Sequence, residues 1–320
     1  MTGEIFALAA AVLWSLHMIF VRKAQAKNAQ GANPMEPMVG LFITIFVNNV
    51  INVFVLAFRY FVWPPVPIYT AGVIALVIAG TFNSFVGRGL LFAAVVILGA
   101  ARTGLTRATM PVFVLLGGVL VLGERFGPRA WLGIGIVLLS LFLMSFDTVR
   151  KEGKKHEGTA QPDTAKGRAS RLRLIKGIAL GLSAALIMGS GNIFRKAGVD
   201  IIPDTILAVS IGSFSALLVC VAILLIKRKG KDMLTAVKNI EFYYMMSGVF
   251  ASAALFSMVY SLSIIPVAIT NSIAATEPLF TILFVWLMKE GQKEKLGVQT
   301  LLFGVIMVIG TVILITSGTN

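Results

Sequence analysis

The sequence predicts an all-α integral membrane protein with ten transmembrane helices, arranged as two inverted repeats of five helices each. Three observations lead to this fold class. First, 57% of the 320 residues are hydrophobic and 13% are charged, against roughly a quarter charged in an ordinary soluble domain. Second, apolar runs long enough to span a bilayer recur along the whole chain. Third, the two halves carry similar motifs in the same order. A soluble enzyme and a disordered protein are therefore excluded, and the single cysteine, Cys220, excludes a disulfide scaffold.

Each predicted helix corresponds to an apolar run of about 20 residues. Such runs are expected to be helical because lipid offers the backbone no hydrogen-bond partners. The first run lacks the basic start and the cleavage site of a signal peptide, so it is expected to remain as a permanent span. The predicted segments are 3–21, 39–58, 69–91, 104–122, 129–147, 175–195, 205–226, 243–264, 267–288 and 297–316.

A basic stretch at 148–174 interrupts this apolar pattern. It contains many lysines and arginines and few apolar residues, and glycine and proline punctuate it. We expect a solvated linker here, between a first repeat at 1–147 and a second repeat at 175–320. A flexible tether is the favoured interpretation of the linker, and a regulatory segment is the alternative.

The two halves match at three places that occur in the same order. The matching pairs are Ile19–Ala24 with Asn192–Ala197, Ala108–Phe113 with Ala275–Phe280, and Glu124 with Glu290. A unit of five helices is odd-numbered, so its second copy must enter the membrane from the opposite side. Inverted repeats of this kind are typical of secondary transporters.

Basic residues predict the orientation of the chain in the membrane. The net charge of +14 comes from lysines and arginines that lie mostly between apolar runs, where they act as orientation signals. No aromatic-interleaved basic module accompanies them, so nucleic acid is not an expected partner. With ten spans, the basic linker and the other basic loops would be cytoplasmic and both termini would lie outside. One span more or fewer would reverse part of this count.

These motifs resemble the EamA-type transporters of the drug/metabolite transporter (DMT) superfamily. The similarity rests on a first helix with Trp14 and a basic end, a fourth helix centred on Pro111 and followed by Leu122–Arg125, and a final helix with Trp131–Gly135, all within a duplicated unit. It implies a ten-helix carrier of small organic metabolites with a central cavity, often an exporter. It also implies that both termini lie inside, in conflict with the charge count. Met110 stands where the family often has an acidic residue, whereas Glu277 keeps it.

Two charged residues beside the paired prolines are the main candidates for a site. A charge inside a bilayer costs about 2.5 kcal/mol or more, so it is expected to face a cavity or a partner. Pro111 removes the usual helical donor for the carbonyl of Arg107, and Pro111 and Pro278 are predicted hinges. The inverted symmetry would bring Arg107 and Glu277 together. Their pair would either hold the halves together or open to bind a substrate or a proton.

The remaining candidates come from other predicted helices. Arg88 either faces the cavity or extends to the cytoplasmic headgroups, and the second interpretation is favoured. His17 and Trp14 either pack between helices or line the cavity, where Trp14 could stack on a planar substrate. Thr270 shares a predicted stripe with Glu277, and helix association is the default role of such polar residues. The candidate substrate-binding residues are Arg107, Glu277, Trp14, His17, Asn83, Arg88 and Thr270.

The favoured function is a secondary active transporter that exports a small organic metabolite across the plasma membrane by alternating access, driven by a proton or substrate gradient. The sequence has no phosphate-binding loop for ATP and no metal-ligand motif such as His-Glu-x-x-His. No catalytic residue, metal or cofactor is therefore expected. The alternatives are a membrane-embedded enzyme and a non-transporting sensor or scaffold. The expected partners are the metabolite and the lipid bilayer, with the chain as a monomer or a homodimer.

Overall fold

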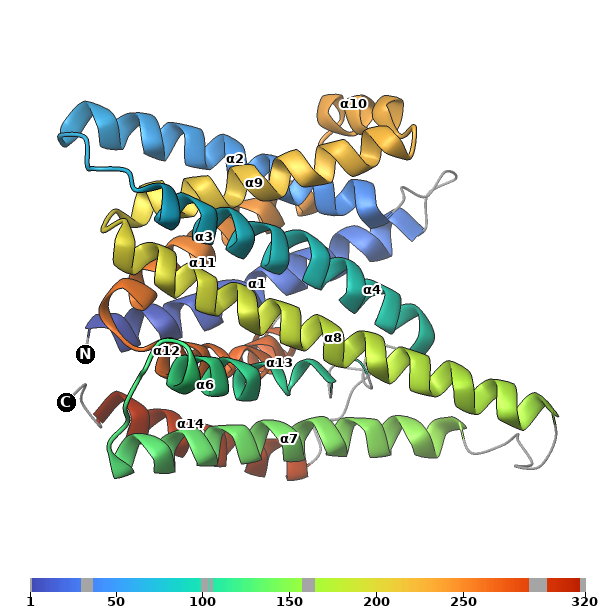
Figure 1. Ribbon diagram of the computed structural model, residues 1–320. Coiled ribbons are helices and arrows are strands. Elements are labelled where there is room, and N and C mark those ends of the chain that lie inside the picture. Colours follow the sequence, from blue (N-terminus) through green and yellow to red (C-terminus); the bar gives the residue numbers. More distant parts are fainter. Residues whose placement is uncertain are drawn as a thin grey trace.

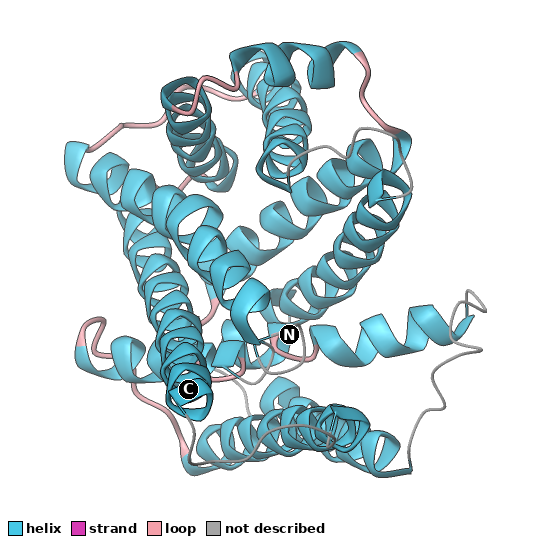
Figure 2. Cartoon of the chain, turned by 90° about the vertical axis from the view of Figure 1, so that its right-hand side faces the viewer, coloured by secondary structure: helices cyan, strands magenta, loops and turns pink. Residues whose placement is uncertain are grey.

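The computed structural model describes residues 2–29, 37–98, 103, 106–156, 165–287 and 298–316. In this part of the chain every regular element is a helix and no strand occurs. Figure 2 shows the helices in cyan, joined by pink loops. The predicted all-α fold is therefore confirmed.

The helices follow one another in two series. The first series is α1 (Thr2–Ala29), α2 (Pro37–Val62), α3 (Thr70–Gly80), the π-helix η1 (Thr81–Val86), α4 (Gly87–Leu98), α6 (Met110–Leu120) and α7 (Pro128–His156). The second series is α8 (Ala165–Ile201), α9 (Thr205–Ile226), α10 (Gly230–Lys238), α11 (Phe242–Ile264), α12 (Val267–Ala274), α13 (Glu277–Leu287) and α14 (Val298–Thr316).

Many of these helices are apolar enough to cross a membrane. Among the described residues, seven segments have both the length and the hydropathy of a membrane span. Shorter apolar helices at Met110–Leu120, Pro128–Met144 and Leu302–Thr316 lie at the three remaining predicted positions. The protein is thus a multi-pass membrane protein, and the count of ten crossings stays a prediction.

The structure corrects the predicted boundaries at two places. The third helix was expected to end at residue 91, but helical backbone continues through η1 and α4 to Leu98. The predicted linker at 148–174 also begins and ends in helix, because α7 continues to His156 and α8 begins at Ala165. Lysine, arginine and alanine are good helix formers, so a basic composition does not by itself end a helix. Residues 157–164 of the linker lie outside the described residues.

The two series run in opposite directions. In Figure 1, α1 begins near the left edge and α8 begins at the right, and α2 and α9 are likewise opposed. The first helix of each series packs on helices of the other, since α1 contacts α11 while α8 contacts α3 and α4. The pairs α2–α9 and α7–α14 also join one series to the other. The halves are therefore interwoven around a pseudo-two-fold relation, and both termini lie at the same end of the molecule.

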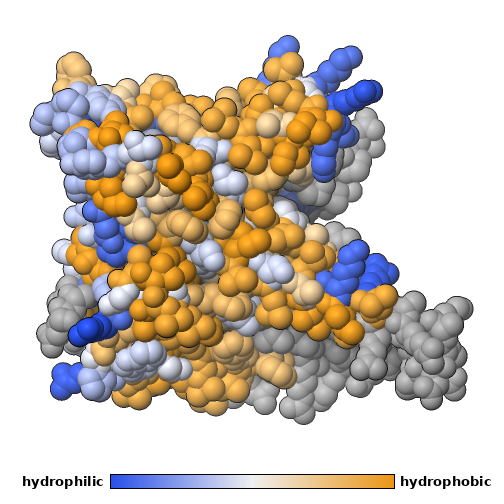
Figure 3. All heavy atoms as spheres, in the orientation of Figure 1, coloured by the Kyte–Doolittle hydropathy of each residue, from blue (hydrophilic) through white to orange (hydrophobic). Residues whose placement is uncertain are grey.

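Hydrophilic and hydrophobic residues occupy different zones of the protein surface. Hydrophilic residues gather near the left and right edges of Figure 3, and hydrophobic residues cover much of the face between them. Large apolar side chains that are exposed include Phe54, Leu218 and Leu225. A broad exposed apolar surface on a soluble protein would favour aggregation, whereas here it matches the hydrocarbon core of a bilayer.

A close helix crossing joins α3 to α9. A Cβ atom at Gly80 would overlap the carbonyl oxygen of Gly212 and the hydroxyl of Ser215. Small residues at such crossings let membrane helices approach closely enough for van der Waals packing. Gly80 therefore sets the distance between the first half and the second.

Gly80→Val is expected to lower the thermal stability of the detergent-purified protein by several degrees, because overpacking a tight contact costs about 1–3 kcal/mol. Gly135→Val is the matched control, since a Cβ at Gly135 would meet no atom within 4 Å. Differential scanning fluorimetry measures both variants. Equal midpoints for the two would contradict a close α3–α9 crossing.

Candidate functional site

Two matching helix breaks lie at the centre of the candidate site. Each break contains an Ala-Thr pair, and the next helix begins one residue before a proline, at Met110 in the first half and at Glu277 in the second. Proline suits the first turn of a helix because its missing N–H would have no partner there. The kinks predicted at Pro111 and Pro278 are therefore turns between separate half-helices.

The two breaks contain equivalent hydrogen bonds. The hydroxyl of Thr109 donates to the carbonyl of Thr106 at 2.7 Å, and the hydroxyl of Thr276 donates to the carbonyl of Ile273 at 2.7 Å. The backbone N–H three residues after each threonine donates to the carbonyl oxygen of that threonine, at 3.0 Å in the first half and 2.9 Å in the second. The duplicated Ala-Thr-x-Pro sequence thus encodes one local structure twice.

An ion pair connects the breaks. Nη2 of Arg107 lies 3.1 Å from Oε2 of Glu277. Glu277 is the first residue of α13, where the positive end of the helix dipole favours a carboxylate. The Arg107 side chain is 35% exposed and that of Glu277 is 14% exposed, so neither is sealed from a ligand. The predicted meeting of these residues is confirmed, and their role in substrate binding stays a prediction.

Arg88 lies on Trp14. Its guanidinium carbon is 5.5 Å from the centre of the indole ring of Trp14 in α1, a distance that allows a cation–π interaction. This contact places Arg88 beside another candidate residue, and its extension toward the headgroups stays a prediction. The rings of His17 and Trp14 are nearly perpendicular, and their centres lie 5.2 Å apart. Nδ1 of His17 is 3.0 Å from the carbonyl oxygen of Ser247 in α11. This contact fixes the imidazole beside Trp14.

The π-helix η1 ends two residues before Arg88. Such wide turns are uncommon and are frequently found at functional sites. Asn83 lies within η1, and its side-chain amide is 2.9 Å from that of Asn192 in α8. Hydropathy gives no sign of a π-helix, and the glycines at Gly80 and Gly87 are the one local feature that marks its ends.

A chain of asparagines joins both halves and leads to another buried arginine. Asn192 donates to Asn271 of α12 at 2.6 Å and accepts from Nη1 of Arg195 at 3.2 Å. Arg195 is 8% exposed, although a count of loop charges would place it outside the membrane. The signal that identifies it is its spacing, because residues three apart share a helix face and Asn192 is itself polar.

These groups form a cationic centre, which we call the arginine cluster: Arg88, Arg107, Arg195 and Glu277. Arg88 lies within electrostatic range of Arg107 and Glu277, and also of Arg195. Neither Arg88 nor Arg195 forms an ion pair with a carboxylate in the described part of the chain. The same residues contain no group of three or more His, Cys, Asp or Glu side chains placed to hold a metal ion.

Thr270 lies apart from this cluster. It is fully buried in α12, and its hydroxyl is 3.0 Å from that of Ser261 in α11. The break after Ala274 separates Thr270 from Glu277, so the predicted common stripe does not form. The structure gives Thr270 a contact between helices.

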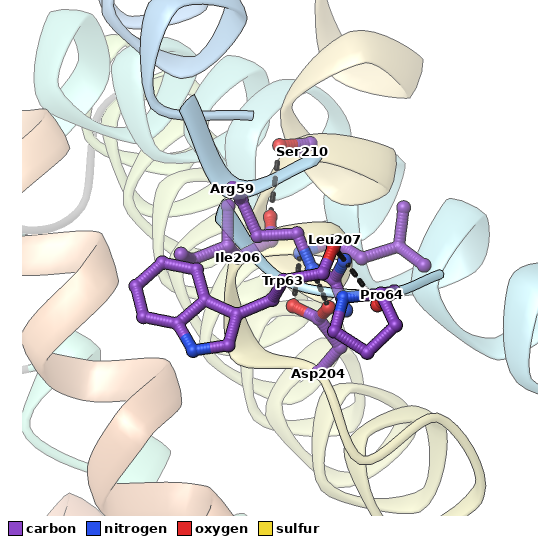
Figure 4. A network of polar contacts seen from close by, with 7 residues as sticks. All are labelled: Arg59, Trp63, Pro64, Asp204, Ile206, Leu207 and Ser210. Carbon is purple, nitrogen blue, oxygen red and sulfur yellow. Dashed lines mark hydrogen bonds and ion pairs between the residues drawn. The ribbon is translucent and has the colours of Figure 1, made fainter. Parts of the chain in front are cut away.

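A second, buried ion pair joins the end of α2 in the first half to the residue before α9 in the second. Nε of Arg59 lies 2.5 Å from Oδ2 of Asp204, and Nη1 of Arg59 donates to the carbonyls of Trp63 and Pro64. Asp204 also accepts from the N–H of Leu207 and thereby caps α9. Figure 4 shows these contacts around the start of α9. Arg59 is thus neutralised by protein groups.

Glu124 makes a third contact between the halves. Its carboxylate accepts from the backbone N–H groups of Val267 and Ala268 at the start of α12. Burial raises the pKa of the Glu124 carboxyl, and these two hydrogen bonds oppose that rise. Glu124 follows the end of its own helix, α6, but it caps a half-helix of the other repeat. Its repeat counterpart, Glu290, lies outside the described residues.

Comparisons with known proteins agree with this architecture. The model of the EamA-like transporter family matches residues 1–146 and 175–316. Among solved structures, 29 chains match significantly. One, titled "Crystal structure of protein", aligns with 98% of this chain and 96% of its own at a TM-score of 0.68 and 12% identity, which is a likeness of fold. No curated protein matches at a significant level.

Asp204→Ala is expected to lower thermal stability strongly. Breaking a buried ion pair costs about 3–5 kcal/mol because it leaves an uncompensated charge, and loss of the α9 cap adds about 1 kcal/mol. Asp204→Asn keeps a capping oxygen and should fall between Asp204→Ala and the wild type in a fluorimetric melt.

Asp200→Ala provides the matched control. Asp200 pairs with Lys196 at 2.8 Å, but its side chain is 49% exposed, and exposed pairs contribute at most about 1 kcal/mol. Similar losses for Asp200→Ala and Asp204→Ala would show that the Arg59 pair has no special structural role.

Proposed function

The chain belongs to the EamA-like transporter family, and we propose that it is a secondary active transporter that exports a small organic metabolite across the plasma membrane by alternating access. The observation that supports this function most directly is the Arg107–Glu277 ion pair. It joins the two repeats at their matching helix breaks.

Broken helices at the interface of inverted repeats favour transport over a static scaffold. Discontinuous helices in secondary transporters present half-helix ends to the substrate near the middle of the membrane. Non-helical backbone is tolerated at membrane depth where it is buried in protein or lines a water-filled path. Here both breaks also provide points about which a half-helix can tilt.

The ion pair provides a way to couple binding to movement. A substrate anion can replace Glu277 as the partner of Arg107, since guanidinium groups bind carboxylate and phosphate oxygens in a bidentate manner. Glu277 released from Arg107 in a poorly solvated site then favours protonation. A ligand shifts a conformational equilibrium only if it binds the two states differently, and opening this pair supplies such a difference.

For orientation, we propose ten crossings with the linker and α10 in the cytoplasm and both termini outside. The placement of both termini at one end supports an even number of crossings. The stretch around α10 supports the cytoplasmic assignment because it carries several basic residues, which favour the cytoplasmic face. They are Lys227, Arg228, Lys229, Lys231 and Lys238.

Glu277→Gln is expected to abolish proton-driven flux in proteoliposomes while substrate exchange persists, because glutamine cannot carry a proton. The substrate would first be found by a counterflow screen of amino acids, nucleosides, sugars and phosphorylated sugars. Arg107→Ala should selectively reduce the flux of anionic compounds. Asp232→Asn, which changes an exposed carboxylate of α10, is the control and should transport normally. Unchanged flux in both site variants would refute this site assignment.

Cysteine accessibility tests the orientation. The one native cysteine, Cys220, is buried, so a membrane-impermeant maleimide should give little background on intact cells. Pro67→Cys, in the exposed α2–α3 loop, should react, and Asn239→Cys, exposed after α10, should react only after the cells are opened. The reverse pattern would place both termini inside, as the family resemblance implies.

A further inference from the structure

We infer that the substrate is a small organic dianion, bound by the guanidinium groups of Arg88, Arg107 and Arg195. This inference rests on the proposed transport function and names the chemical class that the central site would carry. It follows from three features of the cluster: its charge balance, the unused donors of its arginines, and the way their side chains are held.

The charge balance of the cluster is the first feature. Three guanidinium groups and one carboxylate leave a surplus of two positive charges between the helices. Four acidic residues outside the cluster are paired with other cations: Glu241 with Lys27, Asp204 with Arg59, Asp200 with Lys196 and Asp232 with Lys229. Surplus positive charge inside a bilayer is unfavourable, so a ligand with two negative charges would neutralise the centre.

The unused donors are the second feature. An arginine has five N–H donors and no acceptor. Within the described residues, Arg195 uses Nη1 on Asn192, and Arg107 uses Nη2 on Glu277. Arg88 has its cation–π contact with Trp14 and no hydrogen bond in the same part of the chain. Most of the donors in the cluster are thus available to oxygen atoms of a ligand.

The third feature is that two of the arginines are held in place. The asparagine chain through Asn83, Asn192 and Asn271 supports Arg195 from both halves. Trp14 supports Arg88, and His17 braces Trp14. A guanidinium whose orientation is fixed loses less conformational freedom when it binds an oxyanion. One face of Trp14 is already covered by Arg88, so Trp14 is a positioning residue for Arg88.

Glu277 and the three arginines together determine selectivity. A neutral or zwitterionic ligand would leave the surplus of two charges in place, and a monoanion would leave one. A dicarboxylate and a phosphate monoester both carry two negative charges on oxygen near neutral pH, and both suit guanidinium groups. The chemistry that they share is a pair of anionic charges within one small molecule.

Binding to the purified, detergent-solubilised protein tests the inference without requiring transport. The probes are succinate, glycerol phosphate, acetate, alanine and glycerol, each added in a thermal-shift titration at constant ionic strength. We expect stabilisation by succinate, by glycerol phosphate or by both, and less or none by the other three. A response to succinate alone would identify dicarboxylates, and a response to glycerol phosphate alone would identify phosphate monoesters. Stabilisation by alanine or glycerol in preference to both dianions would overturn the inference.

Variants connect the binding to the cluster. Arg195→Gln and Arg88→Gln should each weaken dianion binding by at least about tenfold, since a hydrogen bond to a charged group contributes that much or more. Glu277→Gln should strengthen it, because a competing negative charge is removed. A purely structural role for Glu277 would not produce this gain.

Arg22→Gln is the matched control for Arg195→Gln. Arg22 occupies the corresponding motif position in the first half but is exposed, so its loss should leave dianion binding unchanged. Arg88 is half-buried, which keeps the test informative if Arg195→Gln does not fold. Equal binding by wild type and Arg88→Gln would overturn the inference.

The outcome also separates this inference from the proposed function. Dianion binding that depends on the arginines, with no flux in proteoliposomes, would refute transport and leave the ligand class intact. Flux of a neutral or zwitterionic compound that dianions do not inhibit would refute the ligand class and leave transport intact.

Discussion

The constraint on which the rest of this structure depends is the cost of holding charge inside a bilayer. Each charged side chain at membrane depth costs about 2.5 kcal/mol or more unless a partner or water compensates it. Arg107 and Glu277 come from different halves and compensate each other at 3.1 Å. In the proposed transport cycle, this contact between the repeats is also the contact that a substrate or a proton would alter, so binding and rearrangement of the halves would share one interaction.

The two repeats contain matching helix breaks, but the residues at the two breaks differ, so the site between them is asymmetric. Thr109 and Thr276 make matching hydrogen bonds at the two breaks. The residue before the proline differs, because Met110 stands in the first half and Glu277 in the second. One scaffold thus supplies two helix breaks and a single carboxylate. The carboxylate of Glu277 pairs with Arg107 from the other half. Two identical repeats would contain two such carboxylates and two such arginines, so a single pair requires that the repeats differ.

The sequence was sufficient for features that depend on composition and on the repeat. Hydropathy located the apolar helices, and the inverted symmetry placed Arg107 near Glu277. Features that depend on contacts between distant helices were missed. Nothing local shows that Arg88 turns onto Trp14 or that Arg59 meets Asp204. The helices that extend into the predicted linker were missed for another reason, because hydropathy reports burial and not helix formation.

Two buried arginines show how differently this chain treats positive charge. Arg59 contacts two carbonyls and the carboxylate of Asp204, which also caps α9, so its guanidinium is compensated entirely by the protein. Arg195 is almost as buried but has one amide oxygen as its partner in the described chain. A buried arginine whose function is structural would be expected to resemble Arg59. The incomplete compensation of Arg195, near Arg88 and Arg107, fits the inferred anion site, in which the ligand would supply the missing negative charge.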